Sequence, residues 1–323
     1  MKQIWKDMGI AITIGLIVPA VLLGAVVSLA SKDAPPQEKT EATIPSNPAV
    51  QQQLITVLTD GGQVASMKLD DYLTCVVLAE MPVSFEDEAL KAQSVVARTY
   101  TMRAANGFAK HEQAAVCTQS TCCQGYMSVE TFLNKGGQTQ DVERIRKLIA
   151  QTHDQVLTYE GELIEATYFS CSGGATEDAV AVWGTDVAYL RSVESPGEEH
   201  ATHYTDTVTF STSDFASRLG IDPAGELADW FGETTYTKGG GVATMIIGGK
   251  TFAGTDLRRL LDLRSTAFDI QVSGNTITIT TRGYGHRVGM SQYGADAMAA
   301  AGSVYPEILA YYYQGTELIR YAD

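Results

Sequence analysis

The sequence has 323 residues, of which 45% are hydrophobic and 19% charged, so it is a globular chain long enough for about two domains of roughly 150 residues each. Its formal net charge of −15 at pH 7 argues against a nucleic-acid partner, which would require a basic surface patch. Five cysteines are too few for a disulfide scaffold, so each cysteine is interpreted from its own surroundings.

The N-terminal region predicts a membrane anchor. Residues 9–30 form an uncharged apolar run that is long enough to span a bilayer core of about 30 Å. A cleaved signal peptide is the alternative, since residues 28–30 fit a small-x-small cleavage site, but the run is longer than a usual signal core. Residues 1–8 form a short basic tail, which normally stays in the cytoplasm. We therefore expect a single-pass cell-membrane protein whose C-terminal domain lies outside the cytoplasm.

The chain after the anchor predicts a tether followed by an α+β fold. Residues 31–53 are rich in proline and poor in large apolar side chains, so they cannot bury a core. We expect a mixed helix and sheet core made of residues 54–204 and 275–323. Residues 205–274, with threonine-rich strands and glycine turns, predict a β-rich subdomain inserted into that core.

Two helices near the start of the core follow a predicted hairpin. The first helix begins near Asp70 and must stop at Pro82. The second begins at once, where Ser84 and Asp87 predict a capping box, and it ends near Asn106. The other predicted elements are strands at 54–58, 64–69, 155–159, 166–169 and 275–281, and helices at 141–151, 213–219 and 291–301.

Glu80 is the candidate general acid. It lies four residues after Val76, on the apolar stripe of the first helix, and at the C-terminal end of that helix, where the dipole is negative. Partial burial and the dipole both favour the protonated carboxyl, which is the form that a general acid needs. A simply solvated residue at a helix end is the alternative.

Four potential metal ligands lie close together in sequence, in the pattern His111-x5-Cys117-x4-Cys122-Cys123. Cysteine and histidine in a set of four suit tetrahedral zinc. A disulfide involving Cys117 is the alternative, because the predicted compartment is oxidising. Four protein ligands would close the coordination sphere, so we expect a structural zinc site rather than a catalytic one.

Two glycine-containing segments predict the lip of a binding groove. In residues 168–174, hydroxyl side chains precede two glycines, so this loop can approach a polar ligand closely. In residues 283–294, glycines alternate with hydrogen-bonding side chains, and we expect His286, Gln292 and Tyr293 to contact hydroxyl or acetamide groups of a sugar. A tight turn into a helix is the alternative for this second segment. A serine nucleophile has little support, since the Gly-x-Ser-x-Gly pattern is absent.

A series of motifs follows in order over most of residues 54–320. The motifs are Ala79-Glu80-Met81-Pro82, Glu88-Ala89-Leu90-Lys91-Ala92-Gln93, Ala97-Arg98-Thr99-Tyr100, Ser170-x-Ser172-Gly173-Gly174, Trp183-Gly184, Leu263-Arg264-Ser265-Thr266 and Gly285-His286-x-x-Gly289-Met290-Ser291-Gln292. Together they resemble the signature of the stage II sporulation protein D family (SpoIID/LytB family). Cys122 stands where zinc-binding members can have histidine, and Arg287 stands where many members have glycine.

The resemblance implies a membrane-anchored peptidoglycan lytic transglycosylase that cleaves MurNAc-GlcNAc bonds to 1,6-anhydro products during engulfment in endospore formation. It implies that Glu80 is the catalytic acid, that some members carry zinc at the four ligand positions, and that no cofactor takes part in the chemistry. The implied partners are glycan strands, a cell-wall amidase and a multispanning membrane protein of the engulfment complex. The alternative is a non-catalytic glycan-binding module that recruits or stimulates an amidase. The expected substrate-binding residues are Gln93, Arg98, Tyr168, Ser170, Ser172, His286, Ser291, Gln292 and Tyr293.

Overall fold

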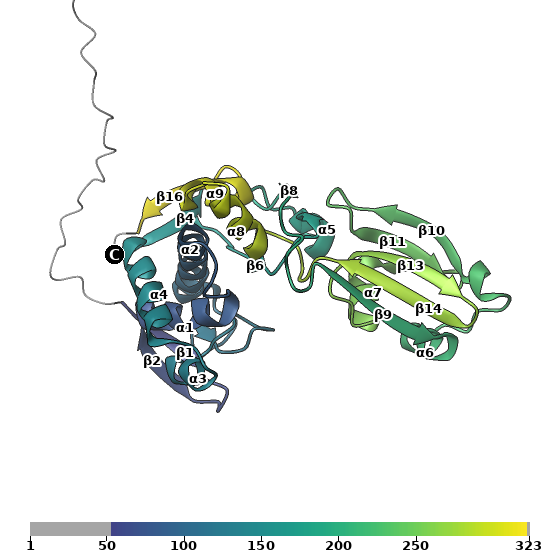
Figure 1. The fold of residues 1–323 in the computed structure, drawn as a ribbon, viewed down its shortest axis with the longest axis horizontal. Helices are drawn as coiled ribbons and strands as arrows, with labels where there is room; N and C mark the ends of the chain where they lie inside the picture. Colours follow the sequence, from purple (N-terminus) through teal and green to yellow (C-terminus); the bar gives the residue numbers. More distant parts are fainter. Residues whose placement is uncertain (1–52, 322–323) are drawn as a thin grey trace, which may run out of the picture. The chain divides into compact units, whose positions relative to one another are not determined.

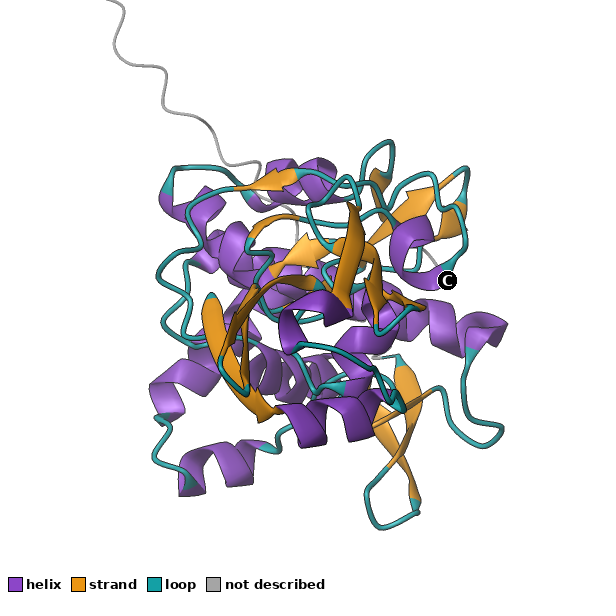
Figure 2. Cartoon of the chain, turned by 90° about the vertical axis from the view of Figure 1, so that its right-hand side faces the viewer, coloured by secondary structure: helices purple, strands orange, loops and turns teal. Residues whose placement is uncertain are grey.

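The computed structural model describes residues 53–321 of the chain (Figure 1). The predicted tail, the predicted anchor and all but the last residue of the predicted tether lie outside this range. Within residues 53–321, no helix is both long and apolar enough to cross a membrane. Helices alternate with several small sheets, which confirms the prediction of a mixed helix and sheet fold (Figure 2).

Two helices form the centre of the first hydrophobic core. These are α1 (Leu69–Glu80) and α2 (Asp87–Arg103). Met81 after α1 has an extended backbone, with φ −124° and ψ 142°, because the residue before a proline is pushed out of the helical region and Pro82 cannot continue the helix. The sequence therefore predicts the end of α1 correctly, and the acidic candidate Glu80 is its last residue.

The start of α2 differs from the prediction. The helix begins at Asp87 after Glu86, and neither residue gives a capping box with Ser84, which lies in the preceding turn. Asp87 instead accepts a 2.7 Å bond from Arg144 Nε, so its carboxylate links two helices rather than capping its own. The predicted end near Asn106 is correct, since Gly107 adopts a φ of 101° that ends the helical backbone.

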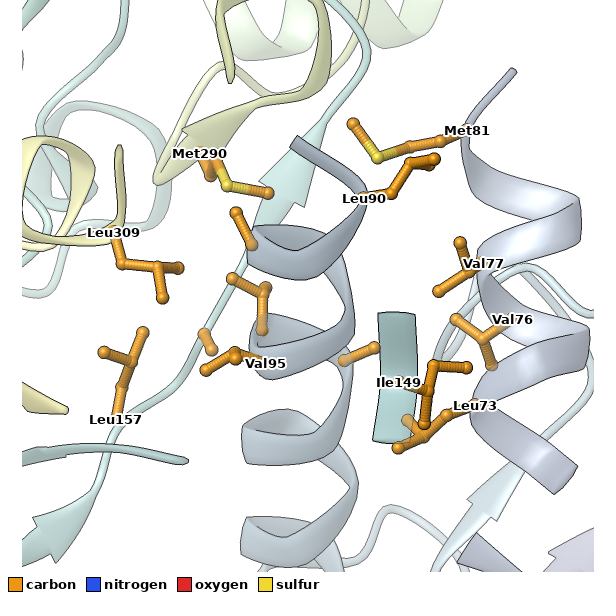
Figure 3. Packing of buried hydrophobic residues seen from close by; sticks show 14 of the residues in the cluster. Leu73, Val76, Val77, Met81, Leu90, Val95, Ile149, Leu157, Met290 and Leu309 are labelled. Atoms are coloured by element: carbon orange, nitrogen blue, oxygen red, sulfur yellow. The ribbon is translucent and has the colours of Figure 1, made fainter. Parts of the chain in front are cut away.

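Later helices pack on α1 and α2 and complete the first core. α4 (Thr139–Gln151) contacts both, and α8 (Gln292–Ala300) and α9 (Tyr305–Tyr312) contact α2. In Figure 3, Ile149 of α4 lies beside Leu73 of α1. Full burial of one such side chain contributes roughly 1.5–3 kcal/mol, so segments from both halves of the chain stabilise this core. The remaining helical elements here are the π-type turn Ala104–Phe108, α3 (Val129–Asn134) and α5 (Ala179–Trp183).

Short sheets join distant segments around these helices. β1 pairs with β2 antiparallel and with β3 parallel, β4 lies between β5 and β16, β7 pairs with β8, and β6 pairs parallel with β15. The last pairing places the start of α8 next to β6, although they are far apart in sequence. The strands are β1 (Leu54–Leu58), β2 (Val64–Lys68), β3 (Val116–Cys117), β4 (Gln155–Tyr159), β5 (Glu162–Leu163), β6 (Tyr168–Phe169), β7 (Gly174–Ala175), β8 (Glu194–Ser195), β15 (Met290–Ser291) and β16 (Glu317–Arg320).

A second hydrophobic core lies in the β-rich segment. The strand predicted at 275–281 was assigned to the core region 275–323, and this boundary is wrong. That strand, β14, pairs along its whole length with β9 and β13, and its buried Ile277 and Ile279 belong to the second core. The elements here are β9 (Thr205–Ser211), α6 (Thr212–Leu219), a 3-10 turn (Leu227–Trp230), β10 (Phe231–Tyr236), β11 (Val242–Ile247), β12 (Lys250–Ala253), α7 (Gly254–Leu260), β13 (Ala267–Ser273) and β14 (Thr276–Arg282).

A buried ion pair connects the β-rich segment to the first core. Arg287 and Glu177 are 1% and 0% exposed, and Arg287 Nη1 lies 3.1 Å from Glu177 Oε1. Both side chains also bond the turn between β10 and β11, because Arg287 Nη2 donates to the Gly239 carbonyl at 2.7 Å and Glu177 Oε1 accepts from Gly241 N–H at 3.1 Å. Arg287 has a φ of 64°, which favours glycine, so these bonds offset a local backbone cost of about 1–2 kcal/mol.

Candidate active site

A cleft of about 810 Å³ opens beside the C-terminal end of α1. Five of the predicted site residues line it, together with two of the predicted metal ligands. Segments from both halves of the chain therefore meet at one surface. The lining residues are Ala79, Glu80, Tyr100, Lys110, Ser120, Thr121, Cys122, Cys123, Glu165, Ala166, Thr167, Tyr168, Phe169, Ser170, Trp183, Tyr284, Gly285, His286 and Gln292.

Three hydrogen-bond donors from three different segments hold the carboxylate of Glu80. Its Oε1 accepts from the backbone N–H of Gly125 and from the hydroxyl of Tyr168 on β6 at 3.2 Å. Its Oε2 accepts from the side-chain amide of Gln292, the first residue of α8, at 3.4 Å. Both carboxylate oxygens therefore have a fixed direction relative to the cleft.

The hydroxyl of Tyr168 has a second acceptor. It lies 3.3 Å from Gln124 Oε1 as well as 3.2 Å from Glu80 Oε1. Burial and the nearby Glu80 carboxylate raise the pKa of Tyr168 well above its usual value, so the phenol keeps its proton. The hydroxyl can donate to an ionised Glu80, and it can donate to Gln124 and accept from a protonated Glu80. The network therefore accommodates both protonation states of the acid.

Gln124 ties the loop before Gly125 to the two central helices. Its side chain is buried, and Nε2 donates to Thr101 of α2 at 3.0 Å and to Tyr72 of α1 at 3.4 Å. A Cβ on Gly125 would lie 2.7 Å from Glu80 Oε1, so only glycine allows the backbone to come this close. The sequence reasoning missed Gly125, for which the only signal was a glycine two residues after a metal-ligand candidate.

The four predicted metal ligands are gathered in the structure and can hold a metal ion. Their ligand atoms all lie within 4.8 Å of one another. His111 Nε2 is 3.5 Å from Cys122 Sγ and 3.7 Å from Cys123 Sγ, and the two sulfurs are 3.9 Å apart. Donor atoms around a tetrahedral zinc lie about 3.5–3.8 Å apart, so the spacing fits that ion. The sulfur separation is too long for a disulfide, and all the cysteines, Cys117 included, are free.

His286 lies in the wall of the cleft with a defined proton position. Its Nδ1 accepts the backbone N–H of Val288 at 3.1 Å, so in the neutral ring the proton is on Nε2. Burial, together with the nearby Arg258 guanidinium, lowers the pKa of His286 to about 4, so the ring is neutral at pH 7. The ring packs edge-on against Phe169, with centroids 5.7 Å apart.

Comparison with known proteins identifies the family of the chain. The family model for stage II sporulation protein matches residues 59–159. The chain is 41% identical to stage II sporulation protein D of Bacillus amyloliquefaciens over 265 residues, which are 80% of this chain and 76% of that protein. The chain belongs to the stage II sporulation protein D family. This family member is also 38% identical to stage II sporulation protein D of Bacillus subtilis (strain 168) over 288 residues, which are 88% of this chain and 82% of that protein.

Another relative has a name that refers to a different activity. The chain is 29% identical to the amidase enhancer of Bacillus subtilis (strain 168) over 299 residues, which are 76% of this chain and 40% of that protein. The name of this relative refers to an amidase rather than to cleavage of glycan.

Two predicted substrate-binding residues on α2 are in the core instead. Arg98 is 2% exposed, and its guanidinium donates to the carbonyls of Thr152 at 2.7 Å and Ile149 at 3.3 Å. It thus ties α2 to the C-terminal end of α4, and this corrects the expectation that Arg98 binds substrate. Gln93 is wholly buried and also does not line the cleft.

Three further predicted substrate-binding residues do not line the cleft. Ser172 is wholly buried and donates to Glu198 Oε2 at 2.9 Å, which corrects its assignment to substrate. Ser291 is the N-cap of α8 and accepts the N–H of Gly294 at 3.2 Å, as the turn-into-helix alternative implies. Tyr293 packs against Phe85, with ring centroids 4.9 Å apart, and does not line the cleft. These side chains shape the loops rather than face a ligand.

The cleft also contains residues that the sequence reasoning did not place in the site. Tyr100, Lys110 and Trp183 all line it. Lys110 Nζ donates to the Cys122 carbonyl at 2.6 Å, next to the metal ligands. Trp183 is 44% exposed. Only its position in a Trp-Gly motif could have marked it, because an isolated tryptophan is far more often a packing residue.

Proposed function

We propose that this family member is a membrane-anchored lytic transglycosylase, which cleaves the MurNAc-GlcNAc bonds of peptidoglycan glycan strands during engulfment in endospore formation. One observation carries the proposal. Glu80 lies in a cleft of about 810 Å³, and donors from three segments orient both of its carboxylate oxygens. A single oriented acid beside a cleft is what cleavage of a glycosidic bond with internal capture requires.

In the first step, Glu80 gives its proton to the glycosidic oxygen. The bond between that oxygen and the anomeric carbon of the muramic acid residue breaks, and the oxygen leaves as a hydroxyl of the next sugar. The anomeric centre becomes oxocarbenium-like and is stabilised by neighbouring dipoles or by the acetamide of the substrate itself. The Tyr168 hydroxyl, 3.2 Å from Glu80, donates to the carboxylate that remains.

In the second step, the Glu80 carboxylate takes the proton of the sugar's own 6-hydroxyl. That oxygen attacks the anomeric carbon, which closes the 1,6-anhydro ring and consumes no water. Glu80 is protonated again and ready for another cycle. Because Tyr168 can turn its hydroxyl to Gln124, 3.3 Å away, the network follows the change in charge without movement of the backbone.

In this proposal the metal site fixes the position of a loop and takes no part in the reaction. His111, Cys117, Cys122 and Cys123 would hold a zinc ion, with four protein ligands and no open position. Bound zinc would supply a structural cross-link. The loop that contains these ligands continues through Gln124 to Gly125, whose N–H donates to Glu80. A loop held in place by the metal would therefore keep the Glu80 carboxylate in its orientation.

The surroundings of the enzyme are proposed from the resemblance and from the relatives. Residues 9–30 would anchor the chain in the cell membrane, with the described part outside the cytoplasm. The likeness to an amidase enhancer supports a cell-wall amidase as one partner. A multispanning membrane protein of the engulfment complex is the other proposed partner. The net charge of −15 supports the expectation of no nucleic-acid partner.

A non-catalytic glycan-binding module that stimulates an amidase is the second candidate function. The likeness to the amidase enhancer favours it. It predicts that the same cleft holds glycan strands but releases no product from them, and that the stimulation of the amidase does not need Glu80.

The test compares Glu80→Gln with the parent chain on peptide-free glycan strands. Glutamine keeps the size of the side chain but cannot give a proton, so we expect at least roughly 10²-fold slower cleavage, the scale of general-acid catalysis, with retained glycan binding. Mass spectrometry should show 1,6-anhydro ends, with no label incorporated from ¹⁸O water. Glu130→Gln, on the exposed first turn of α3, is the matched control and should behave like the parent.

Each other outcome has a distinct meaning. Labelled oxygen in the product would replace transglycosylation with hydrolysis. Binding without any product, in parent and variant alike, would favour the glycan-binding module. Full activity in Glu80→Gln would remove the acid assignment.

A further inference from the structure

Trp183 presents a large apolar surface inside the cleft. It is the last residue of α5, and the next residue, Gly184, has a left-handed backbone that ends the helix there. The indole lines the cleft, yet 44% of the residue is exposed. Packing within the protein thus uses little more than half of its surface, and the rest is available to a ligand.

His286 packs against the indole and adds a hydrogen-bond donor to the same wall of the cleft. The two rings have centroids 5.3 Å apart and are tilted by 54°. The Val288 N–H occupies Nδ1 at 3.1 Å, so Nε2 carries the proton of the neutral ring. Phe169 also packs against the imidazole, with ring centroids 5.7 Å apart and an angle of 62° between the ring planes. The imidazole also interacts with the Tyr168 backbone, and a sugar oxygen at Nε2 would share or replace this interaction. The wall therefore combines an exposed aromatic surface with a neutral N–H donor.

We propose that Trp183 and His286 form a saccharide subsite of the cleft, in which the indole face stacks on a pyranose ring and His286 Nε2–H donates to an acetamide or hydroxyl oxygen. The negative face of an aromatic ring attracts the C–H hydrogens that project from one face of a pyranose. A neutral donor suits the uncharged oxygens of an N-acetyl sugar, whereas an anionic group would call for a cation.

The subsite rests on the proposed function, because it assumes that a glycan strand binds in the cleft that contains Glu80. It deepens that function by naming a specificity-determining residue. Trp183 would hold one sugar of the strand in register, and Glu80 would act on the bond that this register brings to it. The loss of Trp183 should therefore weaken substrate binding much more than it slows the chemistry of bound substrate.

Binding is best measured in the full chain that carries Glu80→Gln, which prevents turnover. The probe is soluble peptide-free glycan strands. We expect Trp183→Ala to raise the Kd at least about 10-fold and Trp183→Phe, which keeps an aromatic face, to raise it less than about 3-fold. Tyr236→Ala is the matched control, because Tyr236 is 61% exposed on β10 and outside the cleft. It should leave the Kd unchanged.

Fluorescence gives a readout that a structural role for Trp183 would not move. The chain has three tryptophans. Glycan should change the emission of the parent, and this change should be absent in Trp183→Phe, which also serves if Trp183→Ala does not fold. With Glu80 intact, Trp183→Ala should raise KM and leave kcat within about 3-fold.

The variants of Trp183 and of Glu80 test the subsite and the acid separately. If Trp183→Ala folds and binds glycan like the parent, or if the emission change persists in Trp183→Phe, the subsite is refuted, whether or not Glu80→Gln is inactive. If Glu80→Gln cleaves at the parent rate, the proposed acid is refuted, whereas a weakened Kd in Trp183→Ala would still locate glycan at this wall.

Discussion

The contact between Gly125 and Glu80 allows the orientation of the acid to be disturbed without changing the acid or the metal ligands. In Gly125→Ala, the new Cβ would lie 2.7 Å from Glu80 Oε1, closer than such atoms approach in proteins, and 3.1 Å from its Cδ, which is a tight contact. Gly125 has no positive φ, so alanine fits the backbone. The carboxylate, at the end of a flexible side chain, is therefore the group that moves.

The magnitude follows from the bond that this movement breaks. The Gly125 N–H donates to Glu80 Oε1, and a hydrogen bond to a charged group contributes about 1.5–3 kcal/mol. Each 1.36 kcal/mol is about tenfold in rate, so we expect kcat/KM for glycan cleavage to fall roughly 10- to 100-fold. The same lost bond lowers folding stability, so the melting temperature should also fall by roughly 3–6 °C.

The assay is the release of 1,6-anhydro products from peptide-free glycan strands, with zinc content and thermal unfolding measured on the same samples. Gly61→Ala is the matched control. It also lacks a positive φ, and its Cβ would meet nothing closer than Thr59 Oγ1 at 3.9 Å. A folded Gly125→Ala protein that keeps its metal and cleaves glycan at the parent rate would refute the idea that this loop positions the acid.

Three further predictions concern the metal, the buried ion pair and histidine. Cys123→Ser should lower the zinc content and lower the melting temperature by roughly 5–10 °C, and elemental analysis with calorimetry checks both. Arg287→Met strands the buried Glu177 carboxylate and should cost about 3–5 kcal/mol in urea unfolding, while Arg287→Met with Glu177→Gln should cost less. The pKa of His286 is about 4 in the folded protein and about 6.5 in the unfolded chain, so the unfolded state takes up the proton first. Stability should therefore fall by up to about 3 kcal/mol as pH drops from about 6.5 to about 4, and His286→Gln should flatten that part of the profile.

Local sequence patterns predicted well where the helices lie, but they predicted poorly which distant residues these helices contact. Pro82 alone determines where α1 ends, because the constraint is steric and acts on the neighbouring residue. The capping box at Ser84 failed because Asp87 has a better partner in Arg144, 57 residues away. The strand at 275–281 was correctly predicted as a strand, but its place in the second core depends on pairing with β9, which no local pattern encodes.

The same division holds for the site. Glu80, Tyr168 and His286 could be predicted because each lies where an element ends or a glycine loop begins, which is where chains expose functional groups. Arg98 was assigned to substrate because it lies in a motif of the family resemblance. Its guanidinium instead donates to carbonyls at and just after the end of α4, 51 to 57 residues away, and lies 3.7 Å from Asp70 of α1. These contacts exist only because α4 and α1 pack against α2.

The bond between Gln292 and Glu80 joins residues that are 212 positions apart. β6 and β15, which place Gln292 next to Tyr168, the other side chain that bonds Glu80, are also separated by more than a hundred residues of chain. Loops of this length make the contact slow to form and late in folding. During synthesis, Glu80 is therefore present long before Gln292, which helps to orient its carboxylate. For a protein proposed to cut the wall of its own cell, the chain topology itself delays the appearance of activity until folding is complete.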